Sequence, residues 1–127
     1  MTRYMVLAVG ARRLAVPLDM VIRALPAAAL SPEGRCGTVA GTLKVGSQVI
    51  PVADPRGPME QDAKEMKTSD AIVLVTTDRG TVGLWVDQVE GIFEPLSQAQ
   101  SPGGLVIQYG HERDQMATVL NPGDLLG

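Results

Sequence analysis

The segment that decides the fold is VAGTLKVGSQVIPVADPR, residues 39–56. Short runs rich in β-branched residues flank Gly46-Ser47, a pattern typical of a β-hairpin with a two-residue turn. Pro51 has no amide hydrogen to donate, so we expect its position to lie at a strand edge or a bulge. Asp54 ends the second run, where an aspartate usually accepts hydrogen bonds from backbone amides and stops the strand. None of these side chains is an obvious catalyst, which favours a binding surface over an active site.

Outward from this segment, the chain shows further hairpins, a predicted short helix and one clear break. Many short strands at hairpin spacing indicate an all-β barrel or sandwich. Pro17, followed by apolar residues at helical spacing, predicts a short helix over residues 18–25 that Pro26 ends. Prolines, a glycine and mixed charges predict a connector over residues 55–69. The other expected hairpins pair residues 4–9 with 14–16, 71–76 with 81–86, and 105–109 with 116–120.

Length and composition limit the classes of function. A chain of 127 residues supports one compact domain. Residues 1–77 carry nine basic and seven acidic side chains, whereas residues 78–127 carry two basic and seven acidic ones, a net charge of −5. The acidic second half is a poor surface for phosphate backbones or anionic lipid, and the scarcity of aromatic residues argues against base stacking. We therefore expect no nucleic acid partner.

Membrane insertion and secretion are not expected either. No segment approaches the roughly 20 apolar residues of a membrane span. The start of the chain has too short an apolar run for a signal peptide. Cys36 is the only cysteine, so no internal disulfide forms, which fits a reducing compartment. We expect a cytoplasmic protein.

Candidate catalytic and metal-binding residues are few. His111 and Cys36 each stand alone in the sequence, so neither a zinc site nor a Cys-His nucleophile is expected. Asp54 and Asp87 each close an apolar strand, and their acid–base interpretation competes with a structural one in which both accept backbone hydrogen bonds. The structural interpretation is favoured. We expect no enzyme activity, no metal and no cofactor.

Trp85 has two interpretations that the sequence leaves open. Alternation beyond Gly83 sends Leu84 and Val86 to one face of a strand and Trp85 to the other. A tryptophan on the outer face is a common anchor at protein interfaces, whereas on an inner face it fills space between two parts of the molecule.

Four stretches together resemble the CheW family of bacterial chemotaxis coupling proteins. The central one is VIPV-x-D-x-R within residues 39–56, and the others are YMVLAVGARRLAVPLDMV (4–21), the VG-x-x-VD-x-V pattern within 71–92, and MATVLNPGDLLG (116–127). The resemblance implies a single domain over residues 1–127. That domain consists of two small SH3-like five-stranded β-barrels side by side around a hydrophobic groove, with a short helix after the first hairpin. The first barrel is expected at about 15–56, with parts of the ends, and the second at 70–120.

The resemblance also implies a role. Proteins of this family are non-catalytic adaptors that bind the cytoplasmic tip of a chemoreceptor in the groove and the regulatory domain of a CheA-type histidine kinase end-on. They work in chemosensory arrays that control chemotaxis or motility. The alternative is a β-barrel interaction module with an unrelated partner or a small ligand.

The expected partner-binding residues depart from the family pattern at two places. Where relatives have Asn-Leu-Arg-Gly, this chain has Lys44-Val45-Gly46-Ser47, so a glycine replaces the arginine. Arg23 stands where relatives often carry a glutamate. These departures leave open whether both partners bind or only some of the usual contacts remain. The expected partner-binding set is Val21, Arg23, Leu25, Lys44, Gly46, Val82 and Trp85.

Overall fold

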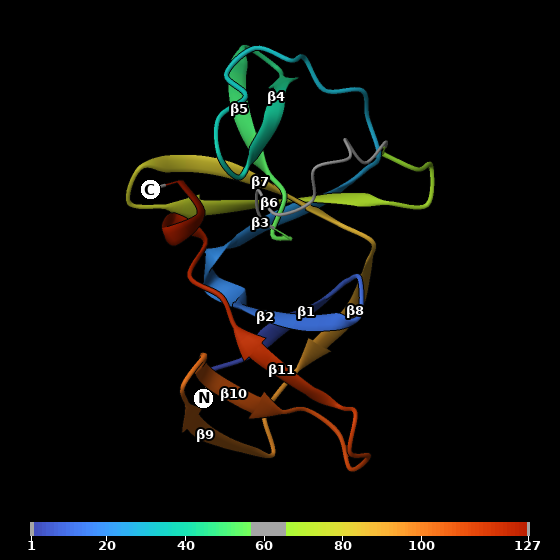
Figure 1. Ribbon diagram of the computed structural model, residues 1–127, viewed down its shortest axis with the longest axis vertical. Helices are drawn as coiled ribbons and strands as arrows, with labels where there is room; N and C mark the ends of the chain where they lie inside the picture. The colour runs from blue at the N-terminus through green and yellow to red at the C-terminus, as the bar shows by residue number, and fades with distance from the viewer. Residues whose placement is uncertain (1, 57–65, 127) are drawn as a thin grey trace.

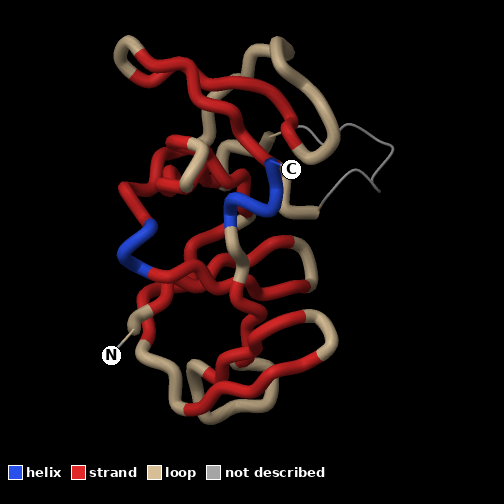
Figure 2. Tube along the Cα trace, turned by 90° about the vertical axis from the view of Figure 1, so that its left-hand side faces the viewer, coloured by secondary structure: helices blue, strands red, loops and turns tan. Residues whose placement is uncertain are grey.

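The computed structural model describes residues 2–56 and 66–126, which form two β-sheets one above the other (Figure 1). The strands are β1 (Tyr4–Val9), β2 (Arg12–Pro17), β3 (Val21–Pro26), β4 (Val39–Val45), β5 (Gln48–Ala53), β6 (Ala71–Thr77), β7 (Gly80–Val86), β8 (Gln88–Phe93), β9 (Ser97–Ser101), β10 (Gly104–Gln108) and β11 (Met116–Val119). Two 3₁₀ turns, η1 (Leu18–Met20) and η2 (Pro122–Leu126), are the helical segments of the described residues (Figure 2).

The two sheets take their strands from different parts of the chain. One sheet has six strands in the order β8-β1-β2-β11-β10-β9, and the other has five in the order β3-β6-β7-β5-β4. Most neighbouring strands are antiparallel, but β2 pairs in parallel with β11 and β5 pairs in parallel with β7. The six-stranded sheet therefore joins the two ends of the chain, and the five-stranded sheet uses its middle.

The strands that share each sheet differ from those expected for barrels at about 15–56, with parts of the ends, and 70–120. Strands β6 and β7 pair with β3 and β5 rather than with the C-terminal strands, and β1 and β2 belong with β8 and β11. The difference arises from pairing between distant strands, such as Val52 of β5 with Gly83 of β7. Hairpin patterns indicate only the pairing of consecutive strands. The expected connector at 55–69 thus lies between two strands of one sheet, and its central part, 57–65, is outside the described residues.

Three apolar clusters fill the part of the molecule that the structure describes. The intersheet core lies between the sheets and joins one face of β1 and β2 to one face of β5, β6 and β7. Each sheet also has an inner cluster on its other face. All six residues of β1 are buried, because alternate side chains enter the intersheet core and the inner cluster of the six-stranded sheet. The intersheet core consists of Met5, Leu7, Val9, Leu14, Val16, Ala53, Val73, Val75, Val82, Leu84 and Val86.

The predicted helix over residues 18–25 is wrong beyond its first turn. Only η1 is helical, and the remainder forms β3, whose backbone pairs with β6 from Val21↔Val75 to Pro26↔Ala71. β-Branched Val21 and Ile22 suit a strand, and eight residues are too few for helical periodicity to outweigh the hydrogen bonds that β6 offers.

The hairpin of β4 and β5 has the predicted turn. Val45 pairs with Gln48 across Gly46-Ser47, and Gly46 has φ +60°, which glycine adopts at little cost.

Pro51 lies in an inner strand rather than an edge strand. It pairs with Thr42 of β4, whose own backbone groups bond Ser31 on the other side, so the proline nitrogen faces away from β4. Pairing with β7 begins only at the next residue, Val52, so no ladder hydrogen bond is lost.

Candidate partner-binding surfaces

The β3 edge surface consists of Val21, Ile22, Arg23 and Leu25. β3 is an outer strand of the five-stranded sheet, and its pairing with β6 is interrupted by a bulge between Val21 and Arg23. Val21 is half-buried against the intersheet core, and Leu25 is half-buried against the inner cluster of its own sheet. Arg23 is exposed. Ile22, at the bulge, is 53% exposed, so this surface combines apolar side chains with one cation.

Ile22 is not among the expected partner-binding residues, because the sequence predicted a helix over residues 18–25 rather than a strand with an exposed side chain at this position. The signal that would have found it is the local β-branched Val-Ile pair before Pro26, which favours a strand with alternating faces.

The second group, Lys44 and Gly46, lies on the β4–β5 hairpin. Both residues are exposed, and Lys44 stands opposite Val49, a 65% exposed apolar residue that the sequence did not single out. Figure 1 shows this hairpin at the far end of the five-stranded sheet, whereas β3 lies nearer the six-stranded sheet. The structure therefore separates the expected residues into two surfaces.

Val82 and Trp85 do not belong to either surface. Val82 is 1% exposed within the intersheet core, and Trp85 is 4% exposed within the inner cluster of the five-stranded sheet. The predicted alternation of Leu84, Val86 and Trp85 is seen, but neither interpretation of Trp85 holds. The tryptophan fills the interior of its own sheet, where it packs in one cluster with Val52 and Ile72.

Trp85 is held by polar contacts as well as by packing. Its indole Nε1–H donates to Asp70 Oδ2 at 2.9 Å, and the backbone N–H of Lys67 donates to the same oxygen at 2.9 Å. Asp70 is buried, and a buried carboxylate is stable only when such donors replace water. The Arg56 guanidinium lies over the indole ring, 5.3 Å from the ring centroid.

Asp54 and Asp87 accept backbone hydrogen bonds where their strands end. Asp54 Oδ1 accepts from the backbone N–H of Arg56 at 3.0 Å, and Asp87 Oδ2 accepts from the backbone N–H of Gly10 at 2.6 Å. Arg56 connects the two carboxylates, because its Nε lies 2.9 Å from Asp54 Oδ1 and its Nη1 lies 3.7 Å from Asp87 Oδ1. Asp87 also joins β7 to β8, so this cluster ties the turn between β1 and β2 to the ends of β5 and β7.

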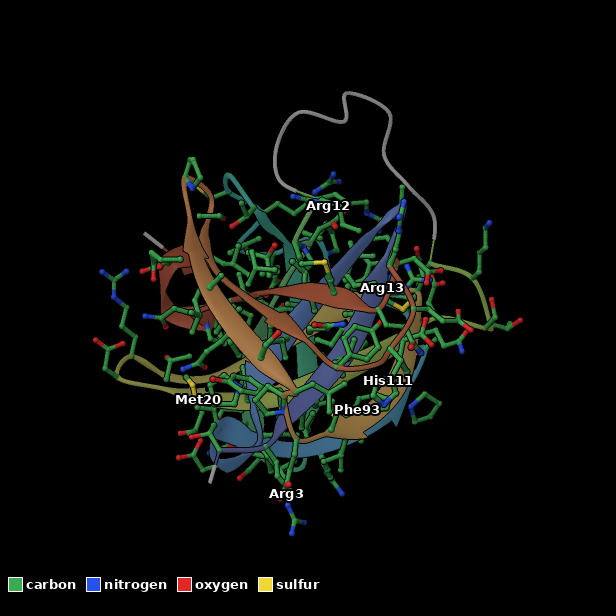
Figure 3. The ribbon with its side chains drawn as sticks, turned by 90° about the horizontal axis from the view of Figure 1, so that it is seen from below. Arg3, Arg12, Arg13, Met20, Phe93 and His111 are labelled. Atoms are coloured by element: carbon green, nitrogen blue, oxygen red, sulfur yellow. The ribbon has the colours of Figure 1, made fainter. Side chains whose placement is uncertain are left out.

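The remaining candidates lie apart from one another. His111 and Cys36 are exposed. Figure 3 shows Arg3 and Arg12 projecting from opposite sides of the molecule, with His111 well away from both. No group of three or more metal-ligating side chains occurs among residues 2–56 and 66–126. Over the same residues, no helix has the length and apolar character needed to cross a bilayer.

Comparison with known proteins places this arrangement in a family. The chain matches the family model of the CheW-like domain over residues 3–127. The chain belongs to the CheW family. Among curated proteins, no sequence match was found.

A CheW protein of known structure has the same fold. The crystal structure of the scaffolding protein TtCheW from Thermoanaerobacter tengcongensis matches with a TM-score of 0.74 at 15% sequence identity, covering 94% of this chain and 88% of that chain. The predicted resemblance to CheW and the predicted all-β fold are both confirmed, with sheets of six and five strands in place of two five-stranded barrels.

Proposed function

We propose that this protein is a non-catalytic adaptor that couples chemoreceptors to a CheA-type histidine kinase in a bacterial chemosensory array. Membership of the CheW family over nearly the whole chain is the observation that carries the proposal. The scaffolding role named for TtCheW, which shares the fold, supports it.

The β3 edge surface is the proposed receptor contact. It offers one largely exposed apolar side chain, Ile22, with half-buried Val21 and Leu25 beside it. Such a surface suits the apolar face of a helix, because the partner gains burial at Ile22 without any rearrangement of the sheet. Arg23 adds a cation to this surface and favours a receptor segment with an acidic side chain at the matching position.

The β4–β5 hairpin is the proposed kinase contact. Lys44 and Val49 are cross-strand neighbours on its exposed side, so they present a cation beside an apolar side chain. Because the hairpin and β3 lie at different places on the sheet, the two partners have separate surfaces and do not compete. Gly46 supplies no side chain to the turn, which leaves this contact weaker than one made with an arginine.

The test is a binding measurement with the two baits from the same organism, a receptor cytoplasmic fragment and the kinase regulatory domain, used separately and together. Ile22→Asp should weaken receptor binding at least about tenfold, since burying a carboxylate without a partner is costly. Val49→Asp should weaken kinase binding and leave receptor binding unchanged.

Met116→Asp is the matched control, because Met116 is 50% exposed, as Ile22 is, but lies on the six-stranded sheet. It should affect neither partner. Binding of the receptor alone would limit the role to an accessory adaptor, and binding of neither bait by the unmodified protein would reject the coupling role. Equal losses with Ile22→Asp and Met116→Asp would reject the β3 edge surface as the receptor contact.

A further inference from the structure

The outer strand β9 differs from the other three outer strands of the two sheets. Outer strands carry unpaired backbone groups, and proteins usually protect them with charges, bulges or covering segments. β3 has Arg23 and a bulge, β8 has Glu90 at a bulge, and β4 has Lys44 and a backbone bridge from Ser31 to Thr42. β9, with the sequence Ser-Gln-Ala-Gln-Ser over Ser97–Ser101, has no charge and no proline.

The backbone of β9 presents unpaired groups at two residues. Ser101 pairs with Gly104 across a two-residue turn, so Ser101, Ala99 and Ser97 direct their backbone groups towards β10. Gln98 and Gln100 therefore direct their N–H and C=O groups away from β10. Among the described residues β9 pairs with β10 alone, and Figure 1 places β9 at the end of the molecule farthest from the five-stranded sheet.

The sequence of β9 is the same in both directions about Ala99. When two copies of such a strand pair in antiparallel fashion about a two-fold axis at Ala99, each residue meets its own kind: glutamine opposite glutamine, serine opposite serine, alanine opposite alanine. Gln98 of one copy lies opposite Gln100 of the other, and the outward backbone groups of these residues form four hydrogen bonds. Each amide side chain both donates and accepts, so facing glutamines also satisfy one another.

The two-fold arrangement explains why the absence of charge matters. In this register position 98 of one copy faces position 100 of the other, so charges of one sign at both positions would repel across the axis, which is destabilising on neighbouring strands. β9 avoids this cost, and the small Ala99 side chain permits close approach where the two strands cross the axis. A strand of five residues buries less area than a stable interface needs, so the association is weak and depends on concentration.

We propose that β9 is a self-association strand through which two copies of this protein pair edge to edge, with Ala99 on the two-fold axis. The six-stranded sheets of the two copies then form one continuous sheet of twelve strands. Both surfaces proposed for the receptor and the kinase lie on the five-stranded sheet and remain free in this dimer.

Two double variants test the register. In Gln98→Lys/Gln100→Lys, each lysine faces a lysine of the other copy, so the dimer dissociation constant should rise at least about tenfold. In Gln98→Lys/Gln100→Glu, each lysine faces a glutamate, and the dimer should be as tight as in the unmodified protein or tighter. Sedimentation velocity from micromolar to millimolar protein measures both, and circular dichroism checks that the exposed substitutions leave the fold intact.

Amide hydrogen exchange of the unmodified protein gives a second measurement that needs no variant. Protection of the Gln98 and Gln100 amides should rise with protein concentration, whereas the Ala99 amide, already bonded to β10, should not change. A protein that stays monomeric over the whole concentration range would overturn the proposal. Equal behaviour of the two double variants, or protection that does not depend on concentration, would overturn it as well.

Discussion

Arg56 links three segments of the chain through one guanidinium group. Its Nε donates to Asp54, its Nη1 lies near Asp87, and its plane covers Trp85. The side chain is 11% exposed, and Nη2 is buried without a hydrogen-bond partner among the described residues. The guanidinium neutralises two partly buried carboxylates at strand ends, so its removal leaves Asp54 without its charged donor.

We expect Arg56→Met to lower the free energy of unfolding by about 1 to 3 kcal/mol, since the stem still packs but a partly buried, charged hydrogen bond is lost. Urea unfolding followed by circular dichroism measures the change. Arg79→Met is the matched control, because Arg79 is exposed in a turn, and it should change stability by less than about 0.5 kcal/mol. Similar losses for both variants would show that Arg56 has no special structural role.

At the scale of one element, β7 depends on the absence of a side chain at Gly83. A Cβ atom built there would lie 2.9 Å from Ile72 Cγ2 and 3.1 Å from Val52 Cγ2, on the two strands that flank β7. Both neighbours are fully buried and β-branched, so neither has an alternative rotamer that gives way easily. This glycine therefore sets the spacing of the inner cluster that Trp85 fills.

We expect Gly83→Ala to destabilise the protein by about 1 to 3 kcal/mol through overpacking. Gly103→Ala is the matched control, since a Cβ atom at Gly103 would meet nothing within 4 Å. It should be neutral or slightly stabilising, because alanine restricts the unfolded chain. Thermal unfolding measures the midpoint temperature of each variant. An unchanged midpoint for Gly83→Ala would mean that the flanking strands separate without cost in stability.

At the scale of the whole molecule, the intersheet core makes the two sheets one cooperative unit. The core takes residues from β1 and β2 on one side and from β5, β6 and β7 on the other. Neither sheet alone covers these side chains, so unfolding one sheet exposes the apolar face of the other.

We expect Leu84→Ala to lower the free energy of unfolding by about 2 to 5 kcal/mol, as for other buried leucines. Trp85 fluorescence, which reports on the five-stranded sheet, and far-ultraviolet circular dichroism should still show one coincident transition. Val49→Ala, at an exposed position, should leave that transition nearly unchanged. Separate transitions from the two probes would show that the sheets unfold independently.

Much of the local structure could be predicted because it depends on neighbouring residues. The turn at Gly46-Ser47 and the alternation around Trp85 follow from glycine conformation and strand periodicity. The strand over Val21–Pro26 was missed, because its hydrogen-bond partner β6 lies some fifty residues further on. The burial of Val82 and Trp85 was missed for the same reason, since the sequence gives the face of a strand but not what covers it.

The sequence by itself determined that the chain is all-β, that it resembles CheW, and where most hairpins turn. These features rest on contacts within a hairpin or on motifs that stay readable in order along the chain. Only the tertiary structure decided which strands share a sheet, which of the expected binding residues are exposed, and that β9 is an unprotected outer strand. Those features depend on pairing between distant segments, such as β1 with β8 and β5 with β7, whose free energy no local pattern encodes.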